Sequence, residues 1–263
     1  IVNDLSNGGA ETANCYFVGH GGTYTFPTVK GNSNVSVGDV ATAEVLWESR
    51  RSSLSWDIIE EVKCSGNTIT FKTSNRFQDG NAVIAAKDAS GKILWSWHIW
   101  FSSNGYNEVK YGNNAGIMMD RNLGATSAQP GVPKSLGLLY QWGRKDPFLS
   151  SANINDNTVA SSTLADYNWS YTTNVQSIEY SIQKPCVMIC ASNEDWCTDE
   201  NVNRWDHYKT IYDPCPAGWR VPDGGENGIW VKSDMVYSEG GNEYRYRFDS
   251  ANRGITLLET ICT

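Results

Sequence analysis

Short stretches of alternating apolar and polar residues fill the first hundred positions of the chain. Residues 23–29 place Tyr24 and Phe26 on one face, and the pattern is typical of strands with one buried face. Similar stretches occupy residues 15–18, 43–48, 57–63, 68–73, 82–87 and 92–101. Ser65-Gly66-Asn67 and residues 88–91 separate two pairs of strands as hairpin turns. About seven short strands with such turns predict an all-β immunoglobulin-like sandwich, antiparallel, over residues 11–103.

The segment 92–101 is the most aromatic of these strands. It alternates Trp95, Trp97 and Ile99 with a second set, Ser96, His98 and Trp100. We interpret it as the last strand of the sandwich, with one face in the core and the other against the second half of the chain. The alternative is an aromatic platform for a ligand. His98 is not expected to bind a metal, because no second histidine lies near it in sequence.

A linker at residues 102–105, Ser-Ser-Asn-Gly, places a domain boundary near residue 104. Residues 106–263 predict an irregular, loop-rich α+β domain. Residues 150–210 show little periodicity and are rich in Ser, Thr, Asn and aromatic side chains. Asp223 and Glu226 have the spacing of a helix capping box, and residues 244–248 and 254–259 predict a final hairpin.

The composition excludes several functional classes. Hydrophobic residues make up 40% of the chain, so a packed core is expected, and the net charge of −8 argues against binding to nucleic acid. No apolar stretch approaches the roughly 18 residues of a membrane span. There are 11 Trp and 13 Tyr but only 3 His. Many aromatic rings favour a function in which rings stack on the apolar faces of sugars, and few histidines argue against acid–base catalysis by imidazole. No catalytic residue, metal or cofactor is predicted.

Seven cysteines give an odd count and no zinc pattern, since Cys186 and Cys190 lack a second close pair. Two readings stay open: buried thiols, or one or two disulfides in an oxidising compartment. Cys15 could pair with Cys64 within the first half.

Two local clusters are read as structural. Arg144-Lys145-Asp146 is interpreted as a turn with an internal salt bridge, with capture of a phosphate or carboxylate as the alternative, and Asp120-Arg121 as a buried ion pair. Residues 212–222, YDPCPAGWRVP, combine three prolines with Gly218 and predict a rigid loop anchored by Trp219.

Three segments of the second half occur together in a known family. They are MDRNLGA at 119–125, GLLYQWGRKDPF at 137–148 and DPCPAGWRVP at 213–222. In this order they resemble the Fibrobacter succinogenes major paralogous domain, a C-type-lectin-like fold of secreted and surface proteins of Bacteroidetes. The segments NCYFV, GTYTFP and GNAVIAAKDASGKILWSWHIW resemble the sandwich that precedes it in Bacteroides fimbrillin-type proteins, including pilus tip subunits.

The resemblance implies a C-type-lectin-like domain over residues 106–263. The family's domain usually continues with further strands, so truncation at the C-terminus is expected here. The Glu-Pro-Asn and Trp-Asn-Asp signatures of calcium-dependent sugar-binding lectins are missing from the sequence. The expected shape is therefore lectin-like without the usual calcium–sugar site.

The leading functional hypothesis is a non-enzymatic cell-surface adhesin or fimbrial tip subunit, located outside the cell or on the outer membrane. Its expected partners are neighbouring pilus or surface subunits and a host or microbial glycan or protein. The candidate ligand-binding residues are the aromatic side chains of the least regular segment: Trp169, Tyr171, Trp196, Trp205 and Tyr208. Local loop packing is the alternative role for each.

Two other functions stay open. One is a formylglycine-generating-like oxidase using Cys186 and Cys190, since the same broad fold includes such enzymes. The other is a structural spacer of a surface assembly, with strand addition at a sheet edge.

Overall fold

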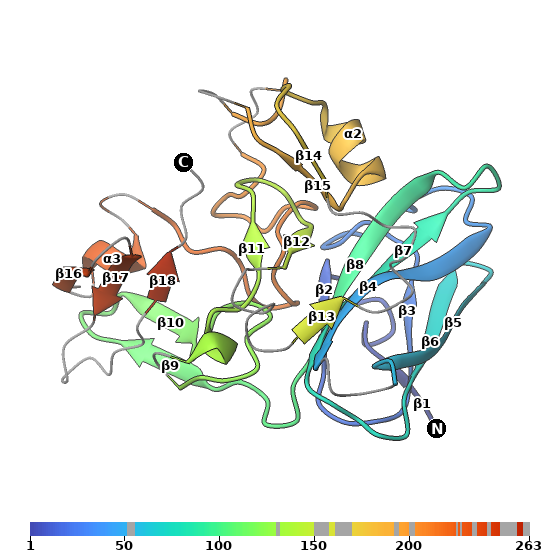
Figure 1. The fold of residues 1–263 in the computed structure, drawn as a ribbon, viewed down its shortest axis with the longest axis horizontal. Helices are drawn as coiled ribbons and strands as arrows, with labels where there is room; N and C mark the ends of the chain where they lie inside the picture. The colour runs from blue at the N-terminus through green and yellow to red at the C-terminus, as the bar shows by residue number, and fades with distance from the viewer. Residues whose placement is uncertain are drawn as a thin grey trace.

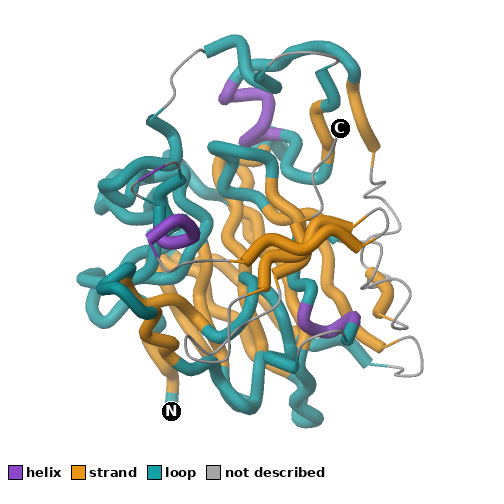
Figure 2. Tube along the Cα trace, turned by 90° about the vertical axis from the view of Figure 1, so that its left-hand side faces the viewer, coloured by secondary structure: helices purple, strands orange, loops and turns teal. Residues whose placement is uncertain are grey.

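The computed structural model describes residues 1–51, 56–129, 132–149, 158–160, 170–191, 195–199, 203–224, 226, 228–232, 236–240, 243–247 and 257–259. Within these residues the chain consists mostly of β-strands in several sheets, with few and short helices (Figures 1 and 2). This agrees with the predicted dominance of β-structure. None of the helices in the described part is long and apolar enough to cross a membrane.

Two sheets form the first half of the molecule (Figure 1). The four-stranded sheet has the order β1 (Val2–Asp4), β3 (Thr23–Pro27), β6 (Thr68–Thr73) and β5 (Ile59–Ser65). The five-stranded sheet has the order β13 (Thr158–Ala160), β4 (Thr42–Arg51), β7 (Gly80–Lys87), β8 (Ile93–Phe101) and β2 (Cys15–Val18). The two predicted hairpins are confirmed as β5–β6 and β7–β8, with Gly66 and Gly91 at positive φ in their turns.

Most strand pairs are antiparallel, as predicted, but two are not. β2 runs parallel to β8, and β1 runs parallel to β3. Period-two alternation identifies a strand and its buried face, but it does not fix the direction in which the strand pairs. The prediction of a purely antiparallel arrangement was therefore wrong for these two edge strands.

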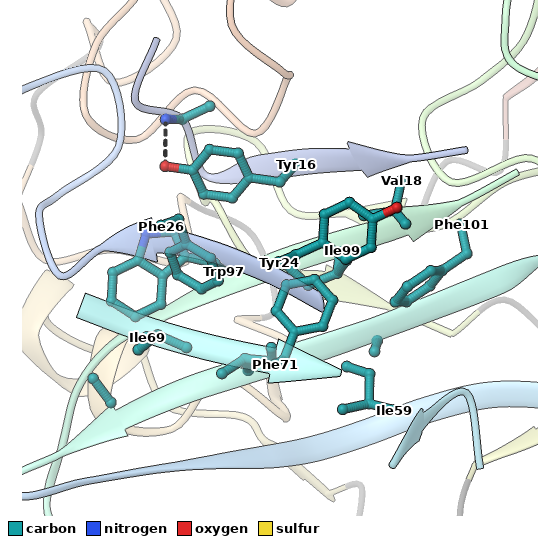
Figure 3. Close-up of a cluster of buried hydrophobic side chains, with 14 of the residues drawn as sticks. Tyr16, Val18, Tyr24, Phe26, Ile59, Ile69, Phe71, Trp97, Ile99 and Phe101 are labelled. Atoms are coloured by element: carbon teal, nitrogen blue, oxygen red, sulfur yellow. Dashed lines mark hydrogen bonds between the residues drawn. The ribbon is translucent and has the colours of Figure 1, made fainter. Parts of the chain in front are cut away.

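The two sheets share one aromatic core (Figure 3). Phe26 and Phe71 from one sheet meet Trp97 and Phe101 from the other, and the Phe26 and Trp97 ring centroids lie 5.2 Å apart. These rings come from the alternate positions that the sequence pattern assigns to the buried face. Edge-to-face pairs of this kind each add about 0.5–1.5 kcal/mol beyond the burial of apolar area.

The outer face of β8 meets the second half of the chain, as predicted. Trp100 is fully buried, and its indole N–H donates to the carbonyl of Ala125 at 3.1 Å. Ser96 donates to Asp146 at 2.6 Å. His98 lies 2.8 Å from the amide oxygen of Asn81, and burial lowers its pKa to about 3. The strand is thus an interior strand and not an open ligand platform.

Short elements joined by loops make up the second half (Figure 1). They are β9 (Glu108–Tyr111), β10 (Gly116–Met119), the 3-10 helix η1 (Pro133–Ser135), β11 (Leu139–Tyr140), β12 (Pro147–Phe148), β14 (Ser170–Thr172), α2 (Ile178–Gln183), β15 (Val187–Ile189), α3 (Ile229–Lys232), β16 (Val236–Gly240), β17 (Glu243–Arg247) and β18 (Leu257–Glu259). β17 and β18 pair antiparallel, which confirms the final hairpin partners. The division into two domains near residue 104 stays a prediction.

The helix predicted to begin at Asp223 is not found at Asp223 or Gly224, and residues 225 and 227 lie outside the described residues. The helix α3 begins at Ile229, and the Asp223 carboxylate instead accepts two hydrogen bonds from the Arg220 guanidinium at 2.7 and 2.8 Å. Arg220 thus binds both carboxylate oxygens of Asp223.

The Pro-rich loop 212–222 is held by a buried carboxylate. Asp213 accepts hydrogen bonds from the backbone N–H of Cys215 and Val221 and from the ammonium group of Lys209. Trp219 is half-buried, with its ring 5.8 Å from that of Tyr106 and perpendicular to it. Tyr106 in turn stacks on Trp100 at 5.8 Å. The loop therefore anchors the connection between the two halves.

Candidate functional site

Two tryptophans, exposed Trp142 and half-buried Trp205, pack together on the second half of the molecule. The ring centroids of Trp142 and Trp205 are 6.4 Å apart and tilted by 58°, and 46% of Trp142 is exposed. Trp142 lies in the turn between β11 and β12, next to Gly143 at φ 73°. A Cβ at Gly143 would come within 2.6 Å of the Arg204 Nε atom. Glycine at this position lets Arg204 lie directly behind the turn.

The Arg204 side chain packs against the Trp142 ring of this pair from the interior of the protein. Its guanidinium lies between two rings, 5.3 Å from the centroid of Trp142 and 5.1 Å from that of Trp196. Only 1% of Arg204 is exposed. It donates to Asp195 Oδ2 at 2.6 Å and to the carbonyl of Asp199 at 2.7 Å. Cation–π contacts contribute about 0.5–2 kcal/mol each, with the larger values for desolvated pairs.

A second buried arginine, Arg144, continues the arrangement. Its guanidinium lies 5.9 Å from the Trp196 centroid and 4.9 Å from the Phe148 centroid. Rings and guanidinium groups thus alternate in one aromatic–arginine stack, whose members are Phe148, Arg144, Trp196, Arg204, Trp142 and Trp205. Burial lowers the pKa of Arg144, while nearby Asp146 acts in the opposite direction.

Arg144 forms its hydrogen bonds with neutral oxygens. They are the side-chain oxygen of Gln141 and the carbonyls of Ser181, Lys184 and Val187. Lys145, in contrast, pairs with Asp146 at 2.7 Å in the interior. The predicted internal salt bridge is confirmed for Lys145 and Asp146, and Arg144 instead ties the β11–β12 turn to α2 and β15. The Asp120–Arg121 pair is also confirmed, at 2.7 Å and largely buried.

The indole N–H groups of two tryptophans in the stack, Trp196 and Trp205, are already occupied. The indole N–H of Trp196 donates to the carbonyl of Trp142 at 2.6 Å, and that of Trp205 donates to the carbonyl of Tyr212 at 3.0 Å. Trp205 therefore offers the apolar surface of its ring, since its indole N–H is already bound.

Charged side chains follow Trp205 along the chain. His207 lies 3.2 Å from Asp223, which binds Arg220, and the exposed Tyr208 meets the His207 ring edge-on at 5.4 Å. The Arg220 hydrogen bonds lower the pKa of Asp223 to about 2, with His207 adding to the effect. Asp223 therefore carries its negative charge at neutral pH, and the group supplies donors and acceptors close to Trp205 in sequence.

The predicted site residues have different surroundings. Trp205 and Tyr208 lie in this region, half-buried and exposed respectively. Trp196 is only 6% exposed, because it lies between the two guanidiniums, so it has the alternative role of local packing. Tyr171 is exposed on β14 and makes no ring contact with the pair in the described part of the chain. Trp169 lies outside the described residues.

Sequence reasoning did not select Trp142. The sequence did contain a signal for Trp142, because it directly precedes Gly143 within residues 137–148. An aromatic residue next to a turn glycine is often exposed on that turn. Its contact with Trp205 joins positions 63 residues apart and could not be read from local pattern.

The cysteines considered for oxidase chemistry differ in environment. Cys186 is buried and Cys190 is exposed, and the six cysteines among the described residues are free thiols. Burial raises the pKa of the Cys186 thiol, whereas an activated nucleophile needs a lowered pKa. The described residues also contain no cluster of three or more His, Cys, Asp or Glu side chains that could hold a metal ion.

No protein-family model, curated protein or solved structure matches the chain. The family resemblance therefore stays a prediction.

Proposed function

We propose that the protein is a non-enzymatic cell-surface adhesin or fimbrial tip subunit that binds carbohydrate through Trp142 and Trp205. The observation that carries the proposal is the contact of exposed Trp142 with half-buried Trp205, whose ring centroids are 6.4 Å apart, with buried Arg204 packed against Trp142. An aromatic pair that is partly exposed on a loop-rich surface is the kind of feature that marks an interaction site.

Carbohydrate is the ligand class that best fits this surface. A pyranose has an apolar face of C–H groups that packs on a flat ring, and burial of that face gives the driving force. Both indole rings offer apolar surface, because the Trp205 N–H is used by Tyr212 and the stack covers the buried side of Trp142. His207, Asp223 and Arg220 supply polar groups for sugar hydroxyls.

Fixed rings favour binding because little side-chain freedom is lost when the ligand arrives. Trp205 is held by its hydrogen bond to Tyr212, and Trp142 by the guanidinium behind it. The proposed mode uses ring contacts and needs no metal ion.

The wider proposal follows the family resemblance. The first half is an immunoglobulin-like sandwich and the second a C-type-lectin-like domain, divided near residue 104. The protein acts at the cell surface or on a fimbrium beside neighbouring subunits. The spacer and oxidase roles remain alternatives.

A glycan array with purified protein tests the proposal. Wild type should bind a defined set of glycans, and Trp142→Ala and Trp205→Ala should each weaken binding roughly tenfold, since ring stacking contributes on the order of 1 kcal/mol or more. Trp56→Ala is a matched control, because Trp56 is half-buried and packs on Arg76 in the first half, away from this surface. A wild type that binds no glycan, or variants that bind as well as wild type, would contradict the proposal.

A further inference from the structure

A cleft of about 620 Å³ lies between the β7–β8 turn and the segment formed by α2 and β15. Six polar side chains line it: Lys87, Ser90, Lys92, Ser170, Gln183 and Lys184. Its volume falls within the range of sites for small ligands, roughly 300–1,000 Å³. Its lining is mostly polar, with Ile93 and Val187 as the larger apolar residues.

The charges in the cleft are not balanced. Lys87 pairs with Glu44, and Asp88 accepts hydrogen bonds from Ser90 and from the backbone N–H of Lys92. The ammonium groups of Lys92 and Lys184 are exposed and form no ion pair within the described residues. Lys92 and Lys184 thus both line one cleft without an ion pair in the described residues. The Ser90 hydrogen bond and the charge of Lys92 nevertheless both help to lower the pKa of the nearby Asp88 carboxyl. The net charge of the whole protein is −8.

Both walls of the cleft are held in place. On one side, Asp88 closes the β7–β8 turn through its contacts with Ser90 and Lys92. On the other side, Arg144 donates to the carbonyls of Lys184 and Val187 at 2.8 Å each. The backbone at Lys92 is therefore fixed in the β7–β8 turn, and the backbone at Lys184 is fixed between α2 and β15. A fixed backbone lowers the entropy that is lost on binding.

We propose that this cleft binds an anionic saccharide, with carboxylate groups at Lys92 and Lys184. Lysine ammonium groups bind carboxylates by charge-assisted hydrogen bonds. Ser90, Ser170 and the side-chain oxygen of Gln183 offer partners for sugar hydroxyls, while the Gln183 amide group donates to Glu179 at 2.7 Å at the rim. An acidic peptide fits less well, because peptide recognition relies on apolar pockets or on strand addition.

This inference does not rest on the aromatic surface at Trp142 and Trp205. The two sites use different side chains, and each can fail without the other.

Isothermal titration with trigalacturonic acid, which carries three carboxylates, tests the proposal. Binding is expected at low salt and should weaken as NaCl is added, because exposed charges are screened. The double variant Lys92→Gln/Lys184→Gln should weaken binding roughly tenfold or more, from the loss of two charge-assisted contacts. Binding should be the same in Trp142→Ala as in wild type.

Controls separate a built site from general attraction to positive charge. Lys63→Gln/Lys72→Gln removes the same charge from β5 and β6, on the four-stranded sheet, and should bind like wild type. Maltotriose, which is neutral, should show no binding that depends on Lys92 and Lys184. The proposal is overturned if trigalacturonic acid does not bind, if the control variant weakens binding equally, or if triglutamate binds as tightly as the saccharide.

Discussion

Arg204 offers the sharpest test of how the exposed tryptophans are held. Replacing it by alanine removes a guanidinium that lies between Trp142 and Trp196 and binds Asp195 and Asp199. Since only 1% of the residue is exposed, the variant leaves a cavity behind Trp142. The half-exposed Asp195 carboxylate also loses its partner, at 2.6 Å.

The magnitude follows from these contacts. Two cation–π contacts contribute about 0.5–2 kcal/mol each. Hydrogen bonds from a charged donor contribute about 1.5–3 kcal/mol. Because contributions in one network do not add fully, we expect Arg204→Ala to lower the free energy of unfolding by about 3–5 kcal/mol. Arg204→Lys keeps the charge but not the flat group, so about 1–3 kcal/mol is expected.

Urea denaturation followed by tryptophan fluorescence measures this difference, with circular dichroism to confirm that each variant folds. Arg76→Ala is the control, because Arg76 lies 4.6 Å from the Trp56 ring but is exposed. It should change stability by no more than about 0.5 kcal/mol. If Arg204→Ala is destabilised by less than 1 kcal/mol, or no more than Arg76→Ala, the reasoning about the aromatic–arginine stack is refuted.

Three further predictions concern the turn, the interior histidine and the thiols. Gly143→Ala should destabilise the protein by about 1–3 kcal/mol in urea denaturation, because φ is positive there and a Cβ would approach Arg204; a neutral result would contradict this. His98 has a pKa lowered to about 3 by burial, so the unfolded chain binds a proton that the folded state does not. Between pH 6.5 and about pH 3, stability should fall by up to about 1.4 kcal/mol per pH unit, and His98→Asn should lose that slope. In denaturant without reductant, at least six thiols should react with Ellman's reagent, and fewer would show disulfides.

The first half was largely predictable because its signals are local. The alternation in residues 92–101 assigned Trp97 to the core and Trp100 to the contact with the second half, and both are found there. The two hairpin turns were equally predictable, because each contains a glycine, Gly66 or Gly91, that adopts a positive φ. The pairing of β13 with β4 was not readable, because a three-residue strand more than a hundred positions away leaves no periodic signal.

The candidate site was less predictable, because its members come from separate stretches of chain. Arg144 and Trp196 were interpreted from their neighbours in sequence, whereas their contact is set by how the β11–β12 turn packs against residues 195–199. Trp205 and Tyr208 were selected because they are aromatic residues of an irregular segment, and that reasoning alone could not separate them from buried Trp196. Exposure depends on the tertiary structure, which local pattern does not give.

The pairing of β13 with β4 has a consequence for any attempt to divide the protein. Residues 158–160 cover the edge of β4 at Ser49, Arg50 and Arg51. A fragment that ends at residue 103 would expose the backbone N–H and C=O groups of that edge, and an open edge recruits strands from other molecules. Expression of residues 1–103 alone should therefore give self-associating material, whereas the same fragment supplied with a peptide spanning residues 156–162 should stay monomeric.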